Sequence, residues 1–571
     1  MSQATAGFRS LDPTLARLAA GSASWVNQNA GMRAALALET AEAVAAHADR
    51  WVEASLAIKA ADSADSAQHR SAIEAEETAT GPLSTLRLLL ATARAWQEIA
   101  EHGRPAGSQA PRVEHPAAGS AGPASFIGVE VLPVPKLHDQ AIFQGHRATV
   151  RCVNPGGIAA FEATWREEVA ERPMAGGLAA VLAAGNVTGL GPADAICQIF
   201  EHGRAVVLKP HPLHAPLEPV YRDAFAPLFA AGLLAIVPGG AETARALTAA
   251  AAVTHVHLTG GQAAFDALVW GGQPAAAGGQ PHLTKPITCE LGNVTPWIVV
   301  PGRYSSGQLR YQADLAAASI ANNTSFNCIA TKCLVTCRDW PQRDEFLGHV
   351  TRRLGSLAPR QAWFPGAAAA WAEATGRSVP GDGTLPWHLA RDVDPTADRR
   401  LLEREWFCPA AAEVALPAAD IEAFCSHATD FVRGLPGSLA ASVTMPETLG
   451  QRDRQRAELL VEHLRYGVVA INTWSALAYA LGSVPWGGYP GSTLADPGSG
   501  IGRVHDPLML PLVHNSILRA PLAGSLTPAW VPWHRSGKRL AQGVLAMYAA
   551  IARGGRGFGP LLRMLPAVVW G

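Results

Sequence analysis

The sequence lacks the features that mark several specialised classes of protein. Its 571 residues carry a formal net charge of −1, so no overall field favours nucleic acid as a partner. It contains no uncharged apolar run of about 18 residues, the length that a membrane-spanning helix needs. No basic and then apolar leader opens the chain, and the eight cysteines form no C-x-x-C pair, so we expect a reducing, cytoplasmic setting.

A metal centre is also not expected. Cys328, Cys333 and Cys337 form a C-x4-C-x3-C pattern, but no nearby histidine or paired cysteine completes a tetrahedral site. We therefore predict a protein without a bound metal.

The composition favours a large globular protein with more than one domain, because 48% of the residues are hydrophobic and 16% are charged. Apolar residues recur every three to four positions in residues 34–58 and 84–103, which predicts packed helices. Residues 104–124 are rich in Pro, Gly, Ala and Ser and indicate an exposed connection. From about residue 175, short apolar runs alternate with helical stretches, a rhythm typical of a parallel sheet.

Four polar residues stand where chemistry is possible, although each also has an ordinary structural interpretation. Lys209 ends the apolar run "AVVL", where a lysine can reach a ligand or simply face solvent. Glu290 interrupts an apolar segment, so it must be paired, neutralised or functional. Asn186 could be a turn residue, and Cys328, within "NNTSFNCIAT", could be inert packing.

Taken together and in order, these residues resemble motifs of the aldehyde dehydrogenase superfamily. "NNTSFNCIATKCLV" is similar to the family's nucleophile segment, and "CELGN" is similar to its general-base segment. "VVLKP" resembles its cofactor-binding strand, with Asn186 at the position of the oxyanion-stabilising asparagine. The resemblance implies catalytic roles for Cys328 as nucleophile, Glu290 as base and Asn186 as oxyanion donor.

The same resemblance implies a cofactor site and a substrate tunnel. "THVHLTGG" and "EREWFCP" resemble segments that contact the cofactor, which assigns it to Lys209, Thr259, Gly260, Gly261, Glu405 and Phe407. The late segment "NTWSALAYALGSVPWGGY" is apolar and aromatic, so it is expected to line the tunnel with Trp474, Tyr479 and Trp486. An apolar aldehyde, aliphatic or aromatic, fits such a tunnel better than a charged one.

The implied fold is α/β and aldehyde dehydrogenase-like, with a Rossmann-type parallel-sheet cofactor domain, an α/β catalytic domain and a small oligomerisation hairpin. The expected parts are N-terminal helices of the cofactor domain (1–125), the hairpin (126–155), the cofactor-binding domain (156–303), the catalytic domain (304–490), a C-terminal oligomerisation strand (491–520) and a basic apolar extension (521–571).

Some positions depart from the family pattern. Pro212 stands where a glutamate commonly holds the adenosine ribose, and losing that carboxylate makes NADP as admissible as NAD. The second glycine expected after "LTGG" is replaced near Phe265, and "SF" stands where Gly-Gln usually precedes the cysteine. The cofactor is therefore expected to be NAD or NADP.

The predicted function is NAD(P)-dependent oxidation of an apolar aldehyde to the carboxylic acid, through a thiohemiacetal and a thioester on Cys328. One alternative is a CoA-acylating aldehyde dehydrogenase or acyl-CoA reductase, in which CoA takes the acyl group instead of water. A second alternative is a non-catalytic binding or structural subunit on the same fold.

The resemblance also implies a homodimer or a higher homo-oligomer, formed through the hairpin and through residues 512–520. After Asp506 the chain has no acidic residue and a formal charge of +7. This tail predicts either a peripheral membrane contact or a segment that packs over the body and covers the tunnel mouth.

Overall fold

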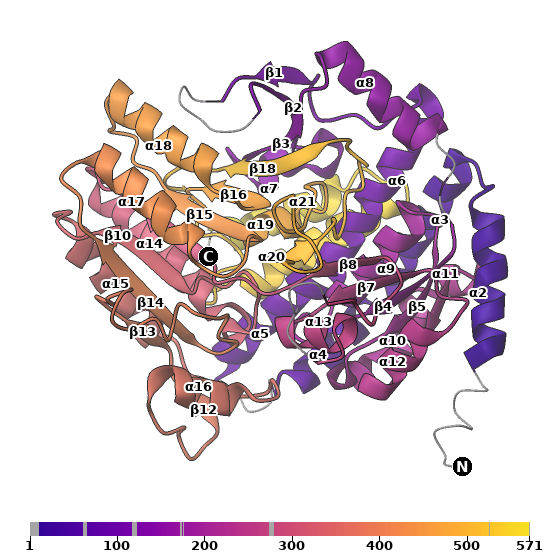
Figure 1. Cartoon of the computed structure of the whole chain (residues 1–571), viewed down its shortest axis with the longest axis horizontal. Coiled ribbons are helices and arrows are strands. Elements are labelled where there is room, and N and C mark those ends of the chain that lie inside the picture. The colour runs from indigo at the N-terminus through magenta and orange to yellow at the C-terminus, as the bar shows by residue number, and fades with distance from the viewer. Residues whose placement is uncertain are drawn as a thin grey trace.

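A computed structural model of the chain describes residues 11–60, 66–116, 123–171, 174, 176–272, 279–524 and 526–569. Two α/β units, each built on a sheet, lie beside each other. The six-stranded sheet is on the right of Figure 1 and the ten-stranded sheet is on the left. The yellow helices of the C-terminal segment lie between and behind these units in this view.

The first sheet has six strands in the order β17-β8-β7-β4-β5-β6. Its strands from β4 to β8 are parallel and consist almost wholly of buried residues, as expected for a sheet covered on both faces. The chain proceeds from β4 outward to β6 on one side and then returns to β7 on the other, so the strand order reverses beside β4. Ligands of such sheets bind beyond the carboxyl ends of the strands at this reversal. The strands are β4 (Leu178–Leu182), β5 (Ala205–Lys209), β6 (Leu234–Ile236), β7 (His255–Thr259), β8 (Ile287–Glu290) and the antiparallel β17 (Gly500–Ile501).

Helices cover this sheet, and those of the N-terminal region contribute to the cover. Helix α2 contacts β4, β5 and β6, whereas α5 also contacts residues Asn322–Ser325 of the second unit. The bounds are α2 (Leu11–Trp25), α3 (Ala30–Ala46), α4 (Ala48–Ile58), α5 (Ala67–Thr78), η2 (Ala79–Leu83), α6 (Ser84–His102), α9 (Leu190–Phe200), η5 (Pro212–Leu217), α10 (Glu218–Ala224), α11 (Ala226–Ala230), α12 (Ala241–Ala249) and α13 (Gln262–Val269).

The second sheet has ten strands in the order β1-β2-β3-β18-β16-β15-β9-β10-β14-β13. Its strands from β13 to β18 run parallel, and β18 then pairs with β3 in antiparallel fashion. The bounds are β9 (Pro296–Val299), β10 (Cys333–Cys337), β13 (His388–Ala390), β14 (Ala410–Leu416), β15 (Ala440–Thr444), β16 (Val468–Ile471) and β18 (Val513–Arg519). Its helices include α14 (Ser306–Ala321), α15 (Arg343–Gly355), α17 (Ile421–Arg433), α18 (Gln451–His463) and α19 (Ala476–Ala480). A separate pair, β11 (Arg360–Gln361) with β12 (Thr384–Leu385), and α16 (Ala367–Thr375) complete this region.

The hairpin expected over residues 126–155 consists of β2 (Phe126–Leu132) and β3 (Arg147–Val153), which pair with each other. They are joined by a 3-10 turn, η3 (Pro135–Leu137), and a short helix, α7 (Asp139–Ile142), and not by a tight turn. Both strands extend the second sheet of the same chain through β18, with β1 (Arg112–Glu114) at the edge. Oligomerisation through this hairpin stays a prediction. The helix α8 (Ile158–Arg166) and the π-helical turn η4 (Glu167–Glu171) follow it.

The C-terminal segment folds into α20 (Gly537–Ala552) and α21 (Phe558–Val569). Helix α20 packs against α3, α5, α6 and η2, so the segment lies over the body of the protein. On α21, Phe558 and Leu562 remain exposed. No helix in the described part of the chain is long and apolar enough to cross a bilayer. Peripheral membrane contact by this segment also stays a prediction.

The mixed α/β architecture with a Rossmann-type parallel sheet confirms the predicted fold class.

Candidate functional site

Two cavities meet at the carboxyl ends of β4, β5, β7 and β8. The larger is a cleft of about 680 Å³, lined by the ends of these strands and by α12 and α13. The smaller is a largely apolar tunnel of about 100 Å³. Four residues line both cavities, namely Asn186, Leu190, Glu290 and Cys328. The three residues predicted to be catalytic are therefore brought together at this junction.

Cys328 and Glu290 are in direct contact. The Cys328 Sγ lies 3.2 Å from Oε1 of Glu290, and the indole N–H of Trp486 donates to Oε2 at 3.1 Å. Glu290 is the last residue of β8 and is 2% exposed. Burial raises the pKa of Glu290 to about 7, although its hydrogen bonds with Cys328 and Trp486 lower it. A carboxyl group with this pKa can take up and release a proton near neutral pH.

The cysteine is a neutral thiol in this arrangement. Burial, and then the charge of Glu290, raise the pKa of Cys328 well above its ordinary value. The thiolate, and not the thiol, is the reactive form of a cysteine. The pocket does not lower the thiol's pKa, and the adjacent Glu290 carboxylate is instead placed to accept the thiol proton.

The nucleophile loop follows α14 as a short 3-10 turn, η6 (Asn322–Ser325). The side-chain amide of Asn186 donates to the Phe326 carbonyl of this loop at 3.1 Å, and Asn323 donates to the same oxygen at 2.8 Å. The amide nitrogen of Asn186 carries a second hydrogen, which is available to an oxygen bound beside Cys328. This geometry is compatible with the predicted oxyanion role.

The predicted cofactor residues line the larger cleft. Lys209 ends β5, and burial lowers its pKa. Thr259 ends β7 and donates its hydroxyl to Asp194 at 2.9 Å, so that hydroxyl is already committed. A Cβ atom placed on Gly261, at the start of α13, would meet no described atom within 4 Å, which leaves the backbone open to a ligand.

Glu405 has a buried polar atom that fits a cofactor in the cleft. Among the described residues, nothing donates a hydrogen bond to its buried Oε1. Burial raises the pKa of Glu405, and the positive charge of Lys332 opposes this rise. A Cβ atom on Gly292 would approach Glu405 Oε2 to 2.2 Å, so a side chain there would displace the Glu405 carboxylate. A buried carboxylate oxygen without a partner fits the hydroxyl group of a bound ribose.

Phe407 lies beside Glu405 in an aromatic wall of the cleft. Its ring stacks with that of Phe326 at 6.1 Å between centroids and contacts Phe364 at 4.9 Å. The wall therefore connects the cofactor cleft to the nucleophile loop, because Phe326 precedes Cys328 by two residues.

The three predicted tunnel residues line the apolar cavity. The rings of Tyr479 and Trp486 pack edge to face at 5.4 Å, and Trp474 donates its indole N–H to the Ile329 carbonyl at 2.8 Å. Trp530, from the segment before α20, also lines the tunnel and packs on Trp474 at 5.1 Å. The C-terminal segment thus contributes to the tunnel, as one of the two alternatives for the tail predicted.

Sequence analysis missed several residues of the site. His211, Arg245 and Phe364 line the cofactor cleft, and Trp530 lines the tunnel. His211 lies two residues after Lys209, so its position beside a predicted cofactor residue could have identified it from the sequence. Phe364 and Trp530 are distant in sequence from every motif. The replacement at Phe265 does not disturb the cleft, because this side chain is fully buried in the core.

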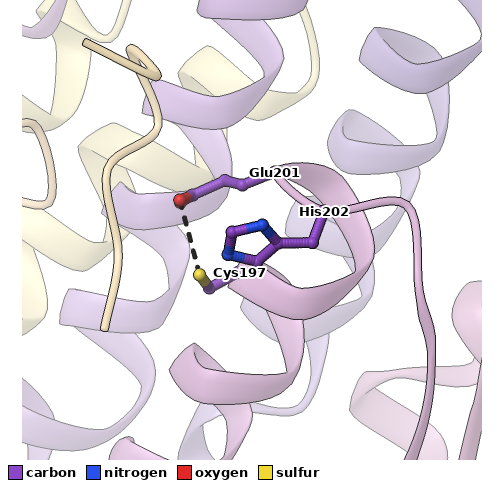
Figure 2. Close-up of side chains that lie close together, drawn as sticks. All are labelled: Cys197, Glu201 and His202. Atoms are coloured by element: carbon purple, nitrogen blue, oxygen red, sulfur yellow. Dashed lines mark hydrogen bonds between the residues drawn. The ribbon is translucent and has the colours of Figure 1, made fainter. Parts of the chain in front are cut away.

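A group of possible metal ligands within the described ranges lies apart from these cavities. Cys197, Glu201 and His202, at the end of α9, approach one another within 4.8 Å (Figure 2). Cys197 donates to Glu201 at 3.4 Å, and both Glu201 oxygens accept the backbone N–H of Asp506 at 2.9 Å. Burial, and then the positive charge of Arg204, lower the pKa of His202 to about 3. Hydrogen bonds therefore account for the positions of Cys197 and Glu201 in this group.

Comparisons with known proteins show a similar sequence over part of the chain and a similar fold over most of it. The sequence model of the aldehyde dehydrogenase family matches residues 148–364. Among solved structures, an indole-3-acetaldehyde dehydrogenase in complex with NAD+ is 18% identical, with a TM-score of 0.58 over 90% of this chain and 89% of that chain. The aldehyde dehydrogenase KauB from Pseudomonas aeruginosa is 17% identical, with a TM-score of 0.58 over 90% of this chain and 88% of that chain.

A Mycobacterium tuberculosis aldehyde dehydrogenase complexed with NAD+ is 16% identical, with a TM-score of 0.55 over 91% of this chain and 92% of that chain. At these identities the structural likeness establishes the fold, and no curated protein matches the sequence. Residues 148–364 thus match the aldehyde dehydrogenase family, within a fold that the chain shares with solved aldehyde dehydrogenases.

Proposed function

We propose that the protein oxidises an apolar aldehyde to the carboxylic acid, with NAD or NADP as hydride acceptor and water as acyl acceptor. The observation that carries this proposal is the 3.2 Å contact between Cys328 Sγ and Glu290 Oε1 at the junction of the two cavities. A nucleophile, a base and an apolar tunnel then meet where a bound aldehyde and a bound nicotinamide would meet.

The cleft fits a dinucleotide in size, since ligand sites commonly enclose about 300–1,000 Å³. Lys209 and Glu405 would hold its ribose groups, and Phe407 would lie beside the nicotinamide. Among the described residues that line the cleft, the acidic ones are Glu290 and Glu405, both at the catalytic end. With Arg245 also on the wall, this supports the use of either NAD or NADP.

In the first step, the Cys328 sulfur attacks the aldehyde carbon while Glu290 accepts the thiol proton. A carbon–sulfur bond forms, the carbonyl π bond breaks, and negative charge develops on the former carbonyl oxygen. The free amide hydrogen of Asn186 would donate to this oxygen. Preorganised donors of this kind typically contribute about 10²–10³ in rate.

When bound, a nicotinamide cofactor would supply a hydride acceptor, and loss of hydride from this adduct would leave a thioester on Cys328. Glu290 must then lose its proton before it can activate water, and a pKa of about 7 permits this near neutral pH. Glu290 takes a proton from water, hydroxide attacks the thioester carbon, and the carboxylic acid leaves as the sulfur regains a proton.

The tunnel supports an apolar substrate, aliphatic or aromatic. Trp474, Tyr479, Trp486 and Trp530 surround a small cavity next to Cys328. Such a lining stabilises an apolar chain or ring by excluding water. Among the described residues that line the tunnel, the charged ones are Glu76 and the catalytic Glu290.

Rapid mixing of the Glu290→Gln variant with cofactor and apolar aldehydes tests the proposal. We expect a slowed burst of up to one equivalent of reduced nicotinamide per site, because the variant no longer accepts the thiol proton of Cys328. Still slower turnover should follow, because the variant also cannot activate water. Free CoA should not restore turnover. Rescue by CoA with an acyl-CoA product would favour the acylating alternative, and no aldehyde-dependent reduction by the unmodified protein would favour a non-catalytic role.

A further inference from the structure

Lys59 lies buried behind the nucleophile loop, although it follows α4 in the N-terminal helical region. Its side chain is almost wholly inaccessible. The ammonium group donates to the backbone carbonyl of Asn186 at 2.6 Å and to Oδ1 of Asn323 at 2.6 Å. One cation therefore contacts both the proposed oxyanion donor and the loop that carries the nucleophile.

The two acceptors of Lys59 are also bonded to each other and to the loop. The Asn323 amide donates to the Asn186 carbonyl at 2.9 Å and to the Phe326 carbonyl at 2.8 Å. The Asn186 amide donates to the same Phe326 oxygen at 3.1 Å. These bonds form a closed network in which Lys59 supplies the charge-assisted members.

The loop needs such support because its backbone is strained. Asn323, Thr324 and Ser325 have φ angles of 52°, 57° and 63°, which place three consecutive residues in the left-handed region. This region is unfavourable for residues with a Cβ atom, and most of all for a β-branched threonine. Strained segments at functional sites persist when surrounding contacts hold them.

The surroundings of Lys59 offset part of the cost of burying its charge: burial lowers the pKa of Lys59, and the charges of Glu77 and Glu76 oppose this change. Glu77 forms an ion pair with the ammonium at 3.4 Å, and the ammonium lies 3.9 Å from the centroid of the Trp363 ring. Both members of the ion pair are almost wholly buried. Burying a charged group costs free energy unless the group is paired and hydrogen-bonded. A buried lysine beside the site therefore suggests a functional role for Lys59.

We propose that Lys59 is a positioning residue of the active site, which holds Asn186 and the strained loop so that the oxyanion donor and Cys328 keep their relative places. This inference rests on the proposed aldehyde oxidation. It assigns to the N-terminal helices, which lie outside the family match at 148–364, a direct part in completing the site.

The test compares Lys59→Met with Lys59→Arg in the full-length protein. Rapid mixing with NADP or NAD and an apolar aldehyde should show a burst of reduced nicotinamide that is slower by about 10² in the methionine variant. Cofactor dissociation constants should stay unchanged, because Lys59 does not line the cofactor cleft. The arginine variant should recover much of the burst rate, since it keeps the cation and its donors.

A matched control is Lys285→Met. The Lys285 ammonium also donates to a backbone carbonyl, that of Ala250 at 2.5 Å, but lies away from both cavities. This variant should retain the burst rate of the unmodified protein.

Lys59→Met leaves Glu77 buried without its cation, so this single variant could lower stability by itself. The double variant Lys59→Met with Glu77→Leu removes both charges, and we expect it to melt close to the unmodified protein yet remain slow. A burst rate restored in the double variant, or unchanged in Lys59→Met, would overturn the positioning role. An unmodified protein that gives no burst would instead count against the proposed function.

Discussion

The free energy of unfolding of the Glu290→Gln variant should depend on pH differently from that of the unmodified protein. Burial raises the pKa of Glu290 from 4.5 to about 7, so the folded state favours the protonated carboxyl. Because the pKa is higher in the folded state, protonation of Glu290 favours folding. This contribution to the free energy of unfolding is fully present below the unfolded pKa of 4.5 and is lost as the pH rises through about 7. Above that pH, the folded protein holds a buried carboxylate at a cost.

The size of this cost follows from the rise in pKa. A difference between 4.5 and about 7 corresponds to about 3 kcal/mol of differential stability between the two protonation states. Glutamine keeps the shape of the side chain and cannot ionise. Relative to the unmodified protein, Glu290→Gln should therefore gain up to about 3 kcal/mol in stability between pH 4.5 and pH 8.5.

Urea unfolding at a series of pH values between 4.5 and 8.5 measures this gain. Glu447→Gln is a suitable control, because Glu447 is exposed and distant from both cavities. A stability difference between Glu290→Gln and the unmodified protein that stays constant across this range would refute the argument. Such a result would mean that the folded protein does not disfavour the ionised carboxylate.

The remaining predictions concern the nucleophile, the oxyanion donor and the tunnel. Cys328→Ala should abolish aldehyde oxidation while cofactor binding persists. Cys333→Ala should change the steady-state rate only slightly, because Cys333 is a buried residue of β10. Steady-state rates and fluorescence titration with cofactor check both predictions. Asn186→Ala should lower kcat by about 10²–10³ with little change in the cofactor dissociation constant, since the donor acts on charge that develops during the reaction. A parallel loss in both quantities would instead point to a structural role for Asn186. Trp530→Ala should open the tunnel at the side of Trp474 and lower KM for longer or bulkier aldehydes relative to short ones; an unchanged chain-length profile would remove Trp530 from the tunnel wall.

Several features of the site could be predicted from the sequence because they depend on local order along the chain. The alternation of apolar runs and helical stretches indicated a parallel sheet, and the carboxyl ends of parallel strands lie at one edge. Lys209, Thr259 and Glu290 each end a strand of that sheet, so they had to lie near one another. The apolar neighbours of Glu290 likewise indicated that its carboxylate had to be paired, neutralised or functional.

Only the tertiary structure decided which distant segments complete the site. Lys59 reaches Asn323 across 264 positions of sequence, and Trp530 reaches Trp474 from a segment with no recognisable motif. The protonation state of Cys328 was also decided there, because it depends on burial and on the 3.2 Å contact with Glu290. Long-range packing sets such contacts and the local dielectric environment, and neither leaves a periodic pattern in the sequence.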